Sequence, residues 1–530
     1  MTNFFKKHTY TPFIFSALLL SLTMWYLQSF YIFVYFFLIP ILFYIDAVKL
    51  DFFNKKEVWK EFFKMFLFGL LFSSISSLHF FSTFPLDWAG INSFPLSFFI
   101  VFSIWLSFGV MMALPVGLWL ISFRFLRSNN IFSNSILGAS LWVLLEYFRS
   151  WWVAVALFGK ETLFGPHHTY YSLAHPVAHT PLLKELVPVG GIYLASFMVI
   201  VINFFFYYSI FNLFKKNKKY TTFYIHILFL VVIISGSYFL MNNIRDDTKQ
   251  EIIATVVNTN ISDEQNERLS IEEQADLIGK TINEKSDIIV VPESTPLILQ
   301  FLTNGLELTK EAKRHLIIGS YTGGELRNLV FFDDVSGRVE YEHKQLLMPI
   351  GEYSISWLKY LMFIFNSKWL EKYELAIPDI KKGREIVVYK DKTKENFFVG
   401  GFLCSENISP YLYREATKKG ATLLVNLSSR ASFRGSELLS RQSISVNTLR
   451  ALENGRYMIV ASNYDKSYVI DDRGNITNTS TGKEKYSYFN SKIVPKTYLT
   501  PYVHYGDYIL VVSLLILISA AILKPSGTKK

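Results

Sequence analysis

The sequence is divided between long apolar runs and one polar stretch, and this division limits the architectures open to the chain. Apolar runs follow one another up to about Leu240, whereas residues 245–500 have the mixed composition of a globular domain. Hydrophobic residues make up 51% of the chain and charged residues only 18%, which is too apolar for an ordinary soluble protein. We therefore expect a membrane protein that carries one large domain outside the bilayer.

Eight apolar runs approach the length of about 20 residues that a helix needs to cross a bilayer. The fifth run contains Glu146 and Arg149, which we expect to face protein or the membrane interface rather than lipid, because charged groups in hydrocarbon are costly. The eight expected spans are 12–27, 31–48, 62–81, 96–123, 136–158, 186–211, 222–241 and 508–523.

Lysine and arginine gather in alternate connections between these spans. Because they accumulate on the cytoplasmic side, we expect both termini inside and residues 245–500 on the outer face. The net charge of +10 comes mostly from these residues, and no basic patch with interleaved aromatic residues indicates binding to nucleic acid. The basic clusters are Lys6 and Lys7, Lys49 to Lys60, Arg124 and Arg127, 215–219, and Lys524 to Lys530.

The polar domain alternates short apolar runs with helical patterns. Strand-like runs occur in "EIIATVVNTNI", "SDIIVVP", "RHLIIGSY", "NFFVGGFL" and "GATLLVNLSS", and a helix is expected near 270–284. This alternation predicts a layered α/β domain. We expect seven spanning helices over 1–244, the α/β domain over 245–503, and the last spanning helix with a basic cytoplasmic tail over 504–530.

Cys404 is the only cysteine of the chain, so it cannot form an intramolecular disulfide, and no Cys/His spacing predicts structural zinc. It is either a packed residue or a nucleophile. Cys404 follows one strand-like run, and Glu293 and Lys344 follow two others. A single polar residue at a strand end is usually a solvated charge, but rigid strands also position functional groups at sheet edges. The three residues together predict a site.

The strings around these residues resemble a known family. "VVPESTP", "HKQLLMPIGEY" and "GFLCSEN" resemble the Glu, Lys, Cys triad of the nitrilase superfamily. The span pattern and the strings "NTLRALENGRYMIVASN" and "LTPYVHYGDY" resemble the bacterial apolipoprotein N-acyltransferase family over nearly the whole chain. The resemblance implies an αββα sandwich for 245–503 and a location in the bacterial inner membrane, with this catalytic domain on the periplasmic side.

The resemblance also implies a reaction and a role for each residue. Cys404 would attack the ester carbonyl of a phospholipid, Glu293 would accept the thiol proton, and Lys344 would stabilise the tetrahedral oxygen. The resulting thioester would acylate the α-amine of the diacylglyceryl cysteine of an apolipoprotein. Glu352 and Glu406 match further family glutamates and are expected to have supporting roles. No metal or other cofactor is expected, and four histidines within 167–179 lack accompanying carboxylates.

The surroundings of the triad depart from the family pattern. Ser405 stands where an aromatic residue is usual, Val291 where tryptophan is frequent, and 428–435 reads "SSRASFRG" in place of "NDAWFG". The "KW" expected near 263–268 is missing. A membrane-bound amidase or hydrolase, an acyltransferase for another amine or hydroxyl acceptor, and a non-catalytic module in which Cys404 is only packed therefore remain as alternatives.

Overall fold

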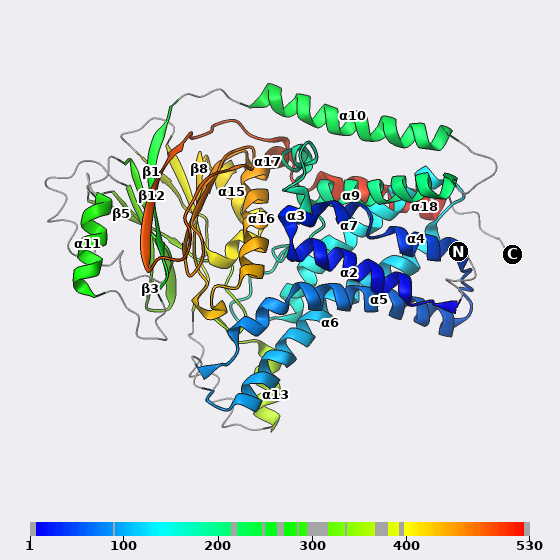
Figure 1. The fold of residues 1–530 in the computed structure, drawn as a ribbon, viewed down its shortest axis with the longest axis horizontal. Helices are drawn as coiled ribbons and strands as arrows, with labels where there is room; N and C mark the ends of the chain where they lie inside the picture. The colour runs from blue at the N-terminus through cyan, green and yellow to red at the C-terminus, as the bar shows by residue number, and fades with distance from the viewer. Residues whose placement is uncertain are drawn as a thin grey trace.

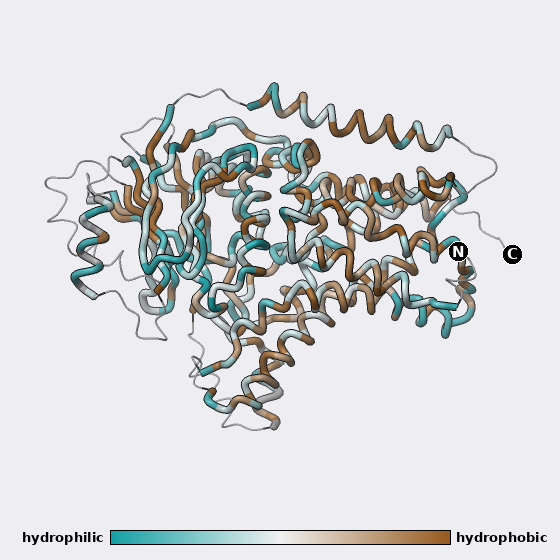
Figure 2. Tube along the Cα trace, in the orientation of Figure 1, coloured by the Kyte–Doolittle hydropathy of each residue, from teal (hydrophilic) through white to brown (hydrophobic). Residues whose placement is uncertain are grey.

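The molecule has two parts that lie side by side along its longest axis, a helical bundle and a sheet domain (Figure 1). The bundle is apolar along most of its length, whereas the sheet domain mixes apolar and polar segments (Figure 2). The start of α2 (Thr11–Trp25) and the end of α18 (Tyr508–Ile522) both lie at the end of the bundle remote from the sheet. This computed structural model describes residues 7–87, 91–213, 220–245, 250–261, 270–282, 286–293, 316–333, 337–365, 380–391 and 397–523.

Within the described ranges, six helical segments are long and apolar enough to cross a membrane, so the expectation of eight is wrong. All eight runs contain helix, but α2 and α18 have only 15 residues each. At 1.5 Å per residue they extend about 22 Å, less than the hydrocarbon core of about 30 Å. The six segments are Leu27–Ala47, Lys55–Thr83, Phe94–Leu126, Ile131–Ala156, Leu183–Leu213 and Thr221–Ile244.

The second of the expected spans is not one continuous α-helix. It holds a 3-10 turn followed by α4, and the short α3 directly precedes it; the remaining long segments contain α5, α6, α7, α9 and α10. The most buried of these is α9, whereas α10 packs along one side of the bundle with most of its surface exposed. The bounds are α3 (Leu27–Phe30), α4 (Ile39–Ala47), α5 (Lys55–Ser76), α6 (Phe94–Leu126), α7 (Ile131–Ala156), α9 (Val187–Leu213) and α10 (Thr221–Ile244).

Glu146 and Arg149 of α7 face protein, as expected. Both side chains are buried, and Arg149 Nη2 lies 3.6 Å from Glu146 Oε1. Glu146 accepts a hydrogen bond from the backbone of Leu173 at 3.0 Å, and Arg149 donates to the carbonyl of Tyr170 at 2.9 Å. The pair therefore fixes the connection between α7 and α9, which we call the α7–α9 loop (157–182), against the bundle.

The sheet domain contains one mixed sheet in the order β5-β4-β3-β2-β1-β9-β8-β7-β6, with β12 beside β1, β10 beside β9 and β11 beside β10. Strands β1, β2 and β3 are parallel to one another, as are β7, β8 and β9. The bounds are β1 (Ile252–Thr259), β2 (Ile288–Val290), β3 (Leu316–Gly323), β4 (Leu326–Asp333), β5 (Arg338–His343), β6 (Val388–Lys390), β7 (Phe398–Leu403), β8 (Leu423–Ser429), β9 (Tyr457–Asn463), β10 (Tyr468–Ile470), β11 (Ile476–Thr479) and β12 (Tyr486–Ile493).

The sheet is folded into two leaves that pack face to face. Alternate residues of β2 show this, because Ile288 and Val290 contact the shared core between the leaves while Ile289 packs with Leu277 of α11 (Ile271–Ile282). In the second leaf, β8 and β9 turn alternate residues toward the same shared core and the others toward α15 (Pro410–Lys418) and α16 (Glu437–Asn454). The layer order is helix, sheet, sheet, helix, which confirms the expected αββα sandwich.

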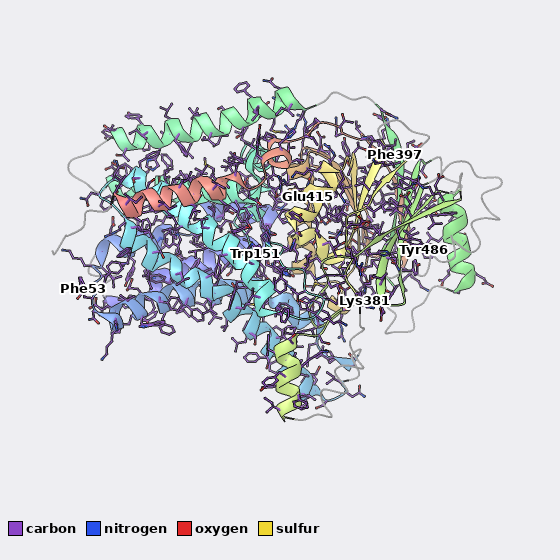
Figure 3. All side chains as sticks on the ribbon, turned by 180° about the vertical axis from the view of Figure 1, so that it is seen from behind. Phe53, Trp151, Lys381, Phe397, Glu415 and Tyr486 are labelled. Atoms are coloured by element: carbon purple, nitrogen blue, oxygen red, sulfur yellow. The ribbon has the colours of Figure 1, made fainter. Side chains whose placement is uncertain are left out.

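The second leaf is attached to the bundle through α16. Arg441 Nη1 donates to the carbonyl of Trp25 at 3.1 Å, and Gln442 Nε2 donates to the carbonyl of Ser76 at 2.9 Å. In Figure 3, which shows the molecule from behind, Trp151 of α7 lies at the end of the bundle that meets the sheet domain. The outer helical layer of the sandwich therefore rests directly on the membrane helices.

Candidate active site

The three residues predicted from strand ends come together at one edge of the sandwich. Glu293 lies just beyond β2, Lys344 directly follows β5, and Cys404 directly follows β7. Because β4 is antiparallel to both β3 and β5, the end of β5 returns to the edge at which β2 and β3 end. The charges of Glu293 and Lys344 both act on the pKa of the Cys404 thiol, so the three side chains share one site across the two leaves.

Cys404 occupies a sharp turn between β7 and a short 3-10 helix, Cys404–Ile408. Its φ of 44° lies in the left-handed region, which is uncommon for a residue with a side chain. Burial raises the pKa of the Cys404 thiol to about 11, and the Glu293 carboxylate adds to this effect while Lys344 opposes it. The thiol is therefore protonated at neutral pH, and attack by its sulfur requires a group that removes the proton.

Two cations and two carboxylates form a buried network beside the thiol. Lys344 Nζ donates to Glu352 Oε1 at 3.0 Å. Arg327, near the start of β4, places Nη1 3.2 Å from Glu293 Oε1 and Nε 2.8 Å from Glu352 Oε1. Glu293, Lys344 and Glu352 are each at most 4% exposed, so these charges interact with little screening by solvent.

The network keeps Lys344 charged. Burial alone would lower the pKa of Lys344, but the carboxylates of Glu352 and Glu293 outweigh it and hold the pKa above its ordinary value. Burial acts to raise the pKa of Glu352, but Lys344 and Arg327 hold that pKa below its ordinary value. A fixed ammonium group is therefore available at the site over the whole physiological pH range.

Glu406 joins the segment that carries Lys344 to the segment that carries Cys404. Its Oε1 accepts from the backbone amides of Gln345 at 2.7 Å and Leu346 at 3.4 Å, and its Oε2 accepts from Leu403 at 2.7 Å. Burial raises the pKa of Glu406 to about 7, although these amides act in the opposite direction. Glu406 thus connects the two leaves at the site.

Three of the departures from the family pattern have a clear structural setting. The hydroxyl of Ser405 is buried and donates to the carbonyl of Leu346 at 2.9 Å, so it adds a further link between the same two segments. Val291 is fully buried in the core between β2 and α11. Within 428–435, Arg430 is buried and pairs with Asp465 at 2.7 Å. Residues 263–268 lie outside the described part of the chain.

The α7–α9 loop of the bundle forms one wall of the site. Thr169 Oγ1 donates to the carbonyl of Ile408 at 2.5 Å, and His167 Nδ1 lies 2.8 Å from the hydroxyl of Ser409. Burial raises the pKa of Tyr170, and Cys404 contributes in the same direction, so the Tyr170 phenol is near the thiol. The turn that carries Cys404 therefore rests on the membrane part of the protein.

The segment after Lys344 also reaches the end of α7. Tyr353 donates its hydroxyl to the carbonyl of Leu157 at 3.0 Å, and Trp357 Nε1 donates to the carbonyl of Ala156 at 2.8 Å. Trp357 belongs to α13 (Ser356–Phe365), whose Tyr360 and Phe363 are about two-thirds exposed. The site thus lies where the sheet domain meets the ends of the membrane helices.

Among the residues that the structure describes, no group of three or more His, Cys, Asp and Glu side chains could hold a metal ion. The four histidines of the α7–α9 loop include two that bind hydroxyls singly, His167 with Ser409 and His179 with Ser445.

Sequence reasoning missed Arg327, Glu342 and Tyr170. Burial raises the pKa of Glu342 to about 9, and its carboxyl accepts from the amide of Val387 at 2.5 Å. A signal for Arg327 was present, because "TGGE" between two strand-like runs indicates a tight turn that returns the next residues to the edge where β3 ends. Tyr170 carries no such signal, since its position depends on how the two parts of the chain pack.

Comparisons with known proteins agree with both parts of this architecture. A model of the apolipoprotein N-acyltransferase N-terminal domain matches residues 12–205, and a carbon-nitrogen hydrolase model matches residues 270–490. Apolipoprotein N-acyltransferase of Pseudomonas paraeruginosa is 26% identical over 433 residues, 78% of each chain. The protein of the same name from Geobacter metallireducens is 32% identical over 206 residues, 36% of this chain and 37% of its own. An amidase from Nesterenkonia sp. is similar in structure, with a TM-score of 0.33 and 13% identity over 50% of this chain and 96% of its own.

The sandwich and its family match define a member of the nitrilase superfamily that is joined to membrane helices. The N-terminal match covers most of those helices, and relatives of one name align along both parts, so the protein can be assigned to a narrower family. The chain belongs to the apolipoprotein N-acyltransferase family and is a multi-pass membrane protein.

Proposed function

We propose that this protein transfers an acyl chain from a phospholipid to the α-amine of the diacylglyceryl cysteine of apolipoproteins, through a thioester on Cys404. The observation that carries the proposal is the meeting of Cys404 with the buried Glu293 and Lys344 at one edge of the sandwich. The family membership supports the substrates, since the relatives are named for this transfer.

In the first half-reaction, Glu293 accepts the proton of the Cys404 thiol as the sulfur attacks the ester carbonyl of the phospholipid. The thiol pKa of about 11 makes this acceptor necessary at neutral pH. Lys344, which the network keeps charged, stabilises the negative oxygen of the tetrahedral intermediate. Collapse of the intermediate breaks the ester bond, returns the proton to the leaving lysophospholipid and leaves an acyl thioester on Cys404.

In the second half-reaction, the acceptor amine attacks the thioester carbonyl. Glu293 accepts a proton from the amine and delivers it to the departing sulfur, so the amide forms and the free thiol is restored. The two substrates therefore use the same site in turn. Glu352 holds Lys344 and Glu406 holds the surrounding backbone, which are the supporting roles that the family pattern suggests.

We further propose that residues 245–503 form the catalytic unit and lie on the outer, periplasmic face of the inner membrane. Two features support this. Both ends of the described chain lie at the far end of the bundle from the sheet domain (Figure 1). Arg127 pairs with Asp46 at 3.0 Å and Arg124 donates to the carbonyl of Val48, so the basic connection after α6 lies beside the start of the connection that carries Lys49 to Lys60. Because such residues accumulate in the cytoplasm, the opposite end of the bundle is outside.

The direct test is the mass of a synthetic diacylated lipopeptide after incubation with the purified full-length protein and phosphatidylethanolamine in detergent. We expect the lipopeptide to gain one acyl chain with the wild type and to stay unchanged with Cys404→Ala and Cys404→Ser. Both variants should unfold thermally near the wild-type temperature, because the hydrogen bond that the sulfur donates to the carbonyl of Ser429 is a long one of 3.9 Å.

Other outcomes would redirect the proposal. An acyl thioester on Cys404 without a change in lipopeptide mass would show that the acceptor is another amine or hydroxyl. Release of free fatty acid at the same rate with and without lipopeptide would identify a hydrolase. If folded wild-type protein formed neither product, the proposal would be refuted.

A further inference from the structure

Arg327 contacts both carboxylates of the network and the backbone of Lys344. Its guanidinium lies between the Glu293 and Glu352 carboxylates, at 3.2 Å and 2.8 Å. Its backbone carbonyl accepts from the amide of Lys344 at 3.0 Å. One residue near the start of β4 thus touches the proposed proton acceptor, the proposed oxyanion-stabilising lysine and the carboxylate that holds this lysine.

The charge balance of the site explains why a second cation is needed. The Glu293 and Glu352 carboxylates supply two negative charges to the network. The Lys344 ammonium group is hydrogen-bonded to Glu352, so Glu293 needs another cation beside it. Burial and a neighbouring carboxylate both favour the protonated form of a carboxyl group. If Glu293 were protonated, it could not accept the proton of the Cys404 thiol.

We propose that Arg327 is a positioning residue whose guanidinium pairs with the Glu293 carboxylate and holds it in a fixed orientation for proton transfer from Cys404. This inference rests on the proposed function, in which Glu293 is the proton acceptor. The guanidinium is suited to the task because its planar fork can contact two carboxylates at once, whereas a lysine ammonium group at this position is a single point of charge.

The surroundings of Arg327 also define the competing explanation. Its side chain is 26% exposed and lines a small pocket together with Glu293, Tyr321 and Asn328. An exposed guanidinium beside a pocket can also bind a lipid phosphate. We favour the positioning role because two of the guanidinium nitrogens already face carboxylates, which would repel a phosphate group.

The test follows formation of the Cys404 thioester in a single turnover. Purified full-length protein is mixed with phosphatidylethanolamine in detergent micelles at pH values from 5 to 9. The reaction is quenched at set times, and the mass of the intact protein is measured by mass spectrometry. The variants are Arg327→Gln and Arg327→Lys, and the control is Arg384→Gln, which removes an exposed arginine of the same domain.

We expect Arg327→Gln to move the acid-side midpoint of the rate upward by about one to two pH units, the usual effect of removing an opposite charge at this distance. On the acidic limb the rate should therefore fall by about tenfold or more. Arg327→Lys should keep the midpoint close to the wild-type value but should not reach the full rate, since a lysine ammonium group cannot hold both carboxylates. The phospholipid concentration for half-saturation should stay unchanged, and Arg384→Gln should match the wild type.

Two results would overturn the inference alone. The first is an unchanged midpoint in Arg327→Gln, with a rate loss that only follows a loss of thermal stability. The second is a raised half-saturating phospholipid concentration with an unchanged midpoint, which would assign Arg327 to phosphate binding. By contrast, absence of a thioester in the folded wild type would refute the proposed function itself, so the two failures are distinguishable.

Discussion

Replacing Glu406 by alanine should both destabilise the sheet domain and slow thioester formation. The substitution removes the acceptor of three buried backbone amides, two of them at 2.7 Å and one at 3.4 Å. At pH 8, where Glu406 with its pKa of about 7 is mostly ionised, hydrogen bonds to its charged carboxylate contribute about 1.5–3 kcal/mol each, so the two short bonds alone predict a loss of about 3–6 kcal/mol. For a domain of this size each kcal/mol corresponds to about 2–4 °C, so the unfolding temperature should fall by at least about 6 °C.

The catalytic effect follows from the position of these amides. They belong to the residues next to Lys344 and Cys404, so without Glu406 the two segments are no longer held together. A displacement of about 1 Å can cost a hundredfold in rate, and we expect a loss of this order in thioester formation at temperatures where the variant is folded.

The assay combines thermal unfolding in detergent with the single-turnover mass measurement. Glu385→Ala, which removes an exposed glutamate of the same domain, is the matched control and should behave as the wild type. If Glu406→Ala unfolded within about 2 °C of the wild type and kept its rate, the account of Glu406 as the link between the leaves would be wrong.

Two further predictions concern buried carboxylates. Burial raises the pKa of Glu342 from 4.5 to about 9, so the folded protein retains this proton and loses stability as pH rises from about 4.5 through about 9. The glutamine of Glu342→Gln cannot ionise, so the unfolding temperature of this variant should fall less between pH 6 and pH 9 than that of the wild type. An equal fall in both proteins would contradict the raised pKa of Glu342. Glu146→Ala leaves Arg149 buried without its carboxylate partner and should cost about 3–5 kcal/mol of stability. It should also slow thioester formation, because the α7–α9 loop that carries Tyr170 is then held less firmly. Phe148→Ala, on the exposed face of the same helix, should have neither effect.

The architecture could be predicted from the sequence because it depends on local patterns. Buried parallel strands appear as short apolar runs, and the expected strands and the helix near 270–284 correspond to β1, β2, β3, β7, β8 and α11. The number of spans could not be predicted in the same way. A predominantly apolar run of 16 residues such as 12–27 has the composition of a span, but the helix it forms ends at Trp25 and is too short to cross the hydrocarbon core alone.

The ion network around the site was beyond sequence reasoning. Glu293, Lys344 and Cys404 were found because each directly follows or closely follows a strand, and that placement is local. Arg327 reaches them only through the antiparallel turn between β3 and β4 and the pairing of β4 with β5. Tyr170 reaches them only because the α7–α9 loop packs against the second leaf. Such contacts are set by tertiary packing, which no sequence window contains.

The contact between the α7–α9 loop and the turn after Cys404 limits how this protein can be recombined. A chimaera joined in the connection between α10 and β1 would take the bundle from one relative and the sandwich from another. It would then pair a foreign loop with the carbonyl of Ile408 and the hydroxyl of Ser409, both of which bind that loop here. The smallest unit that can be exchanged intact therefore includes residues 157–182 together with the sandwich, although α9 and α10 lie between them in the chain.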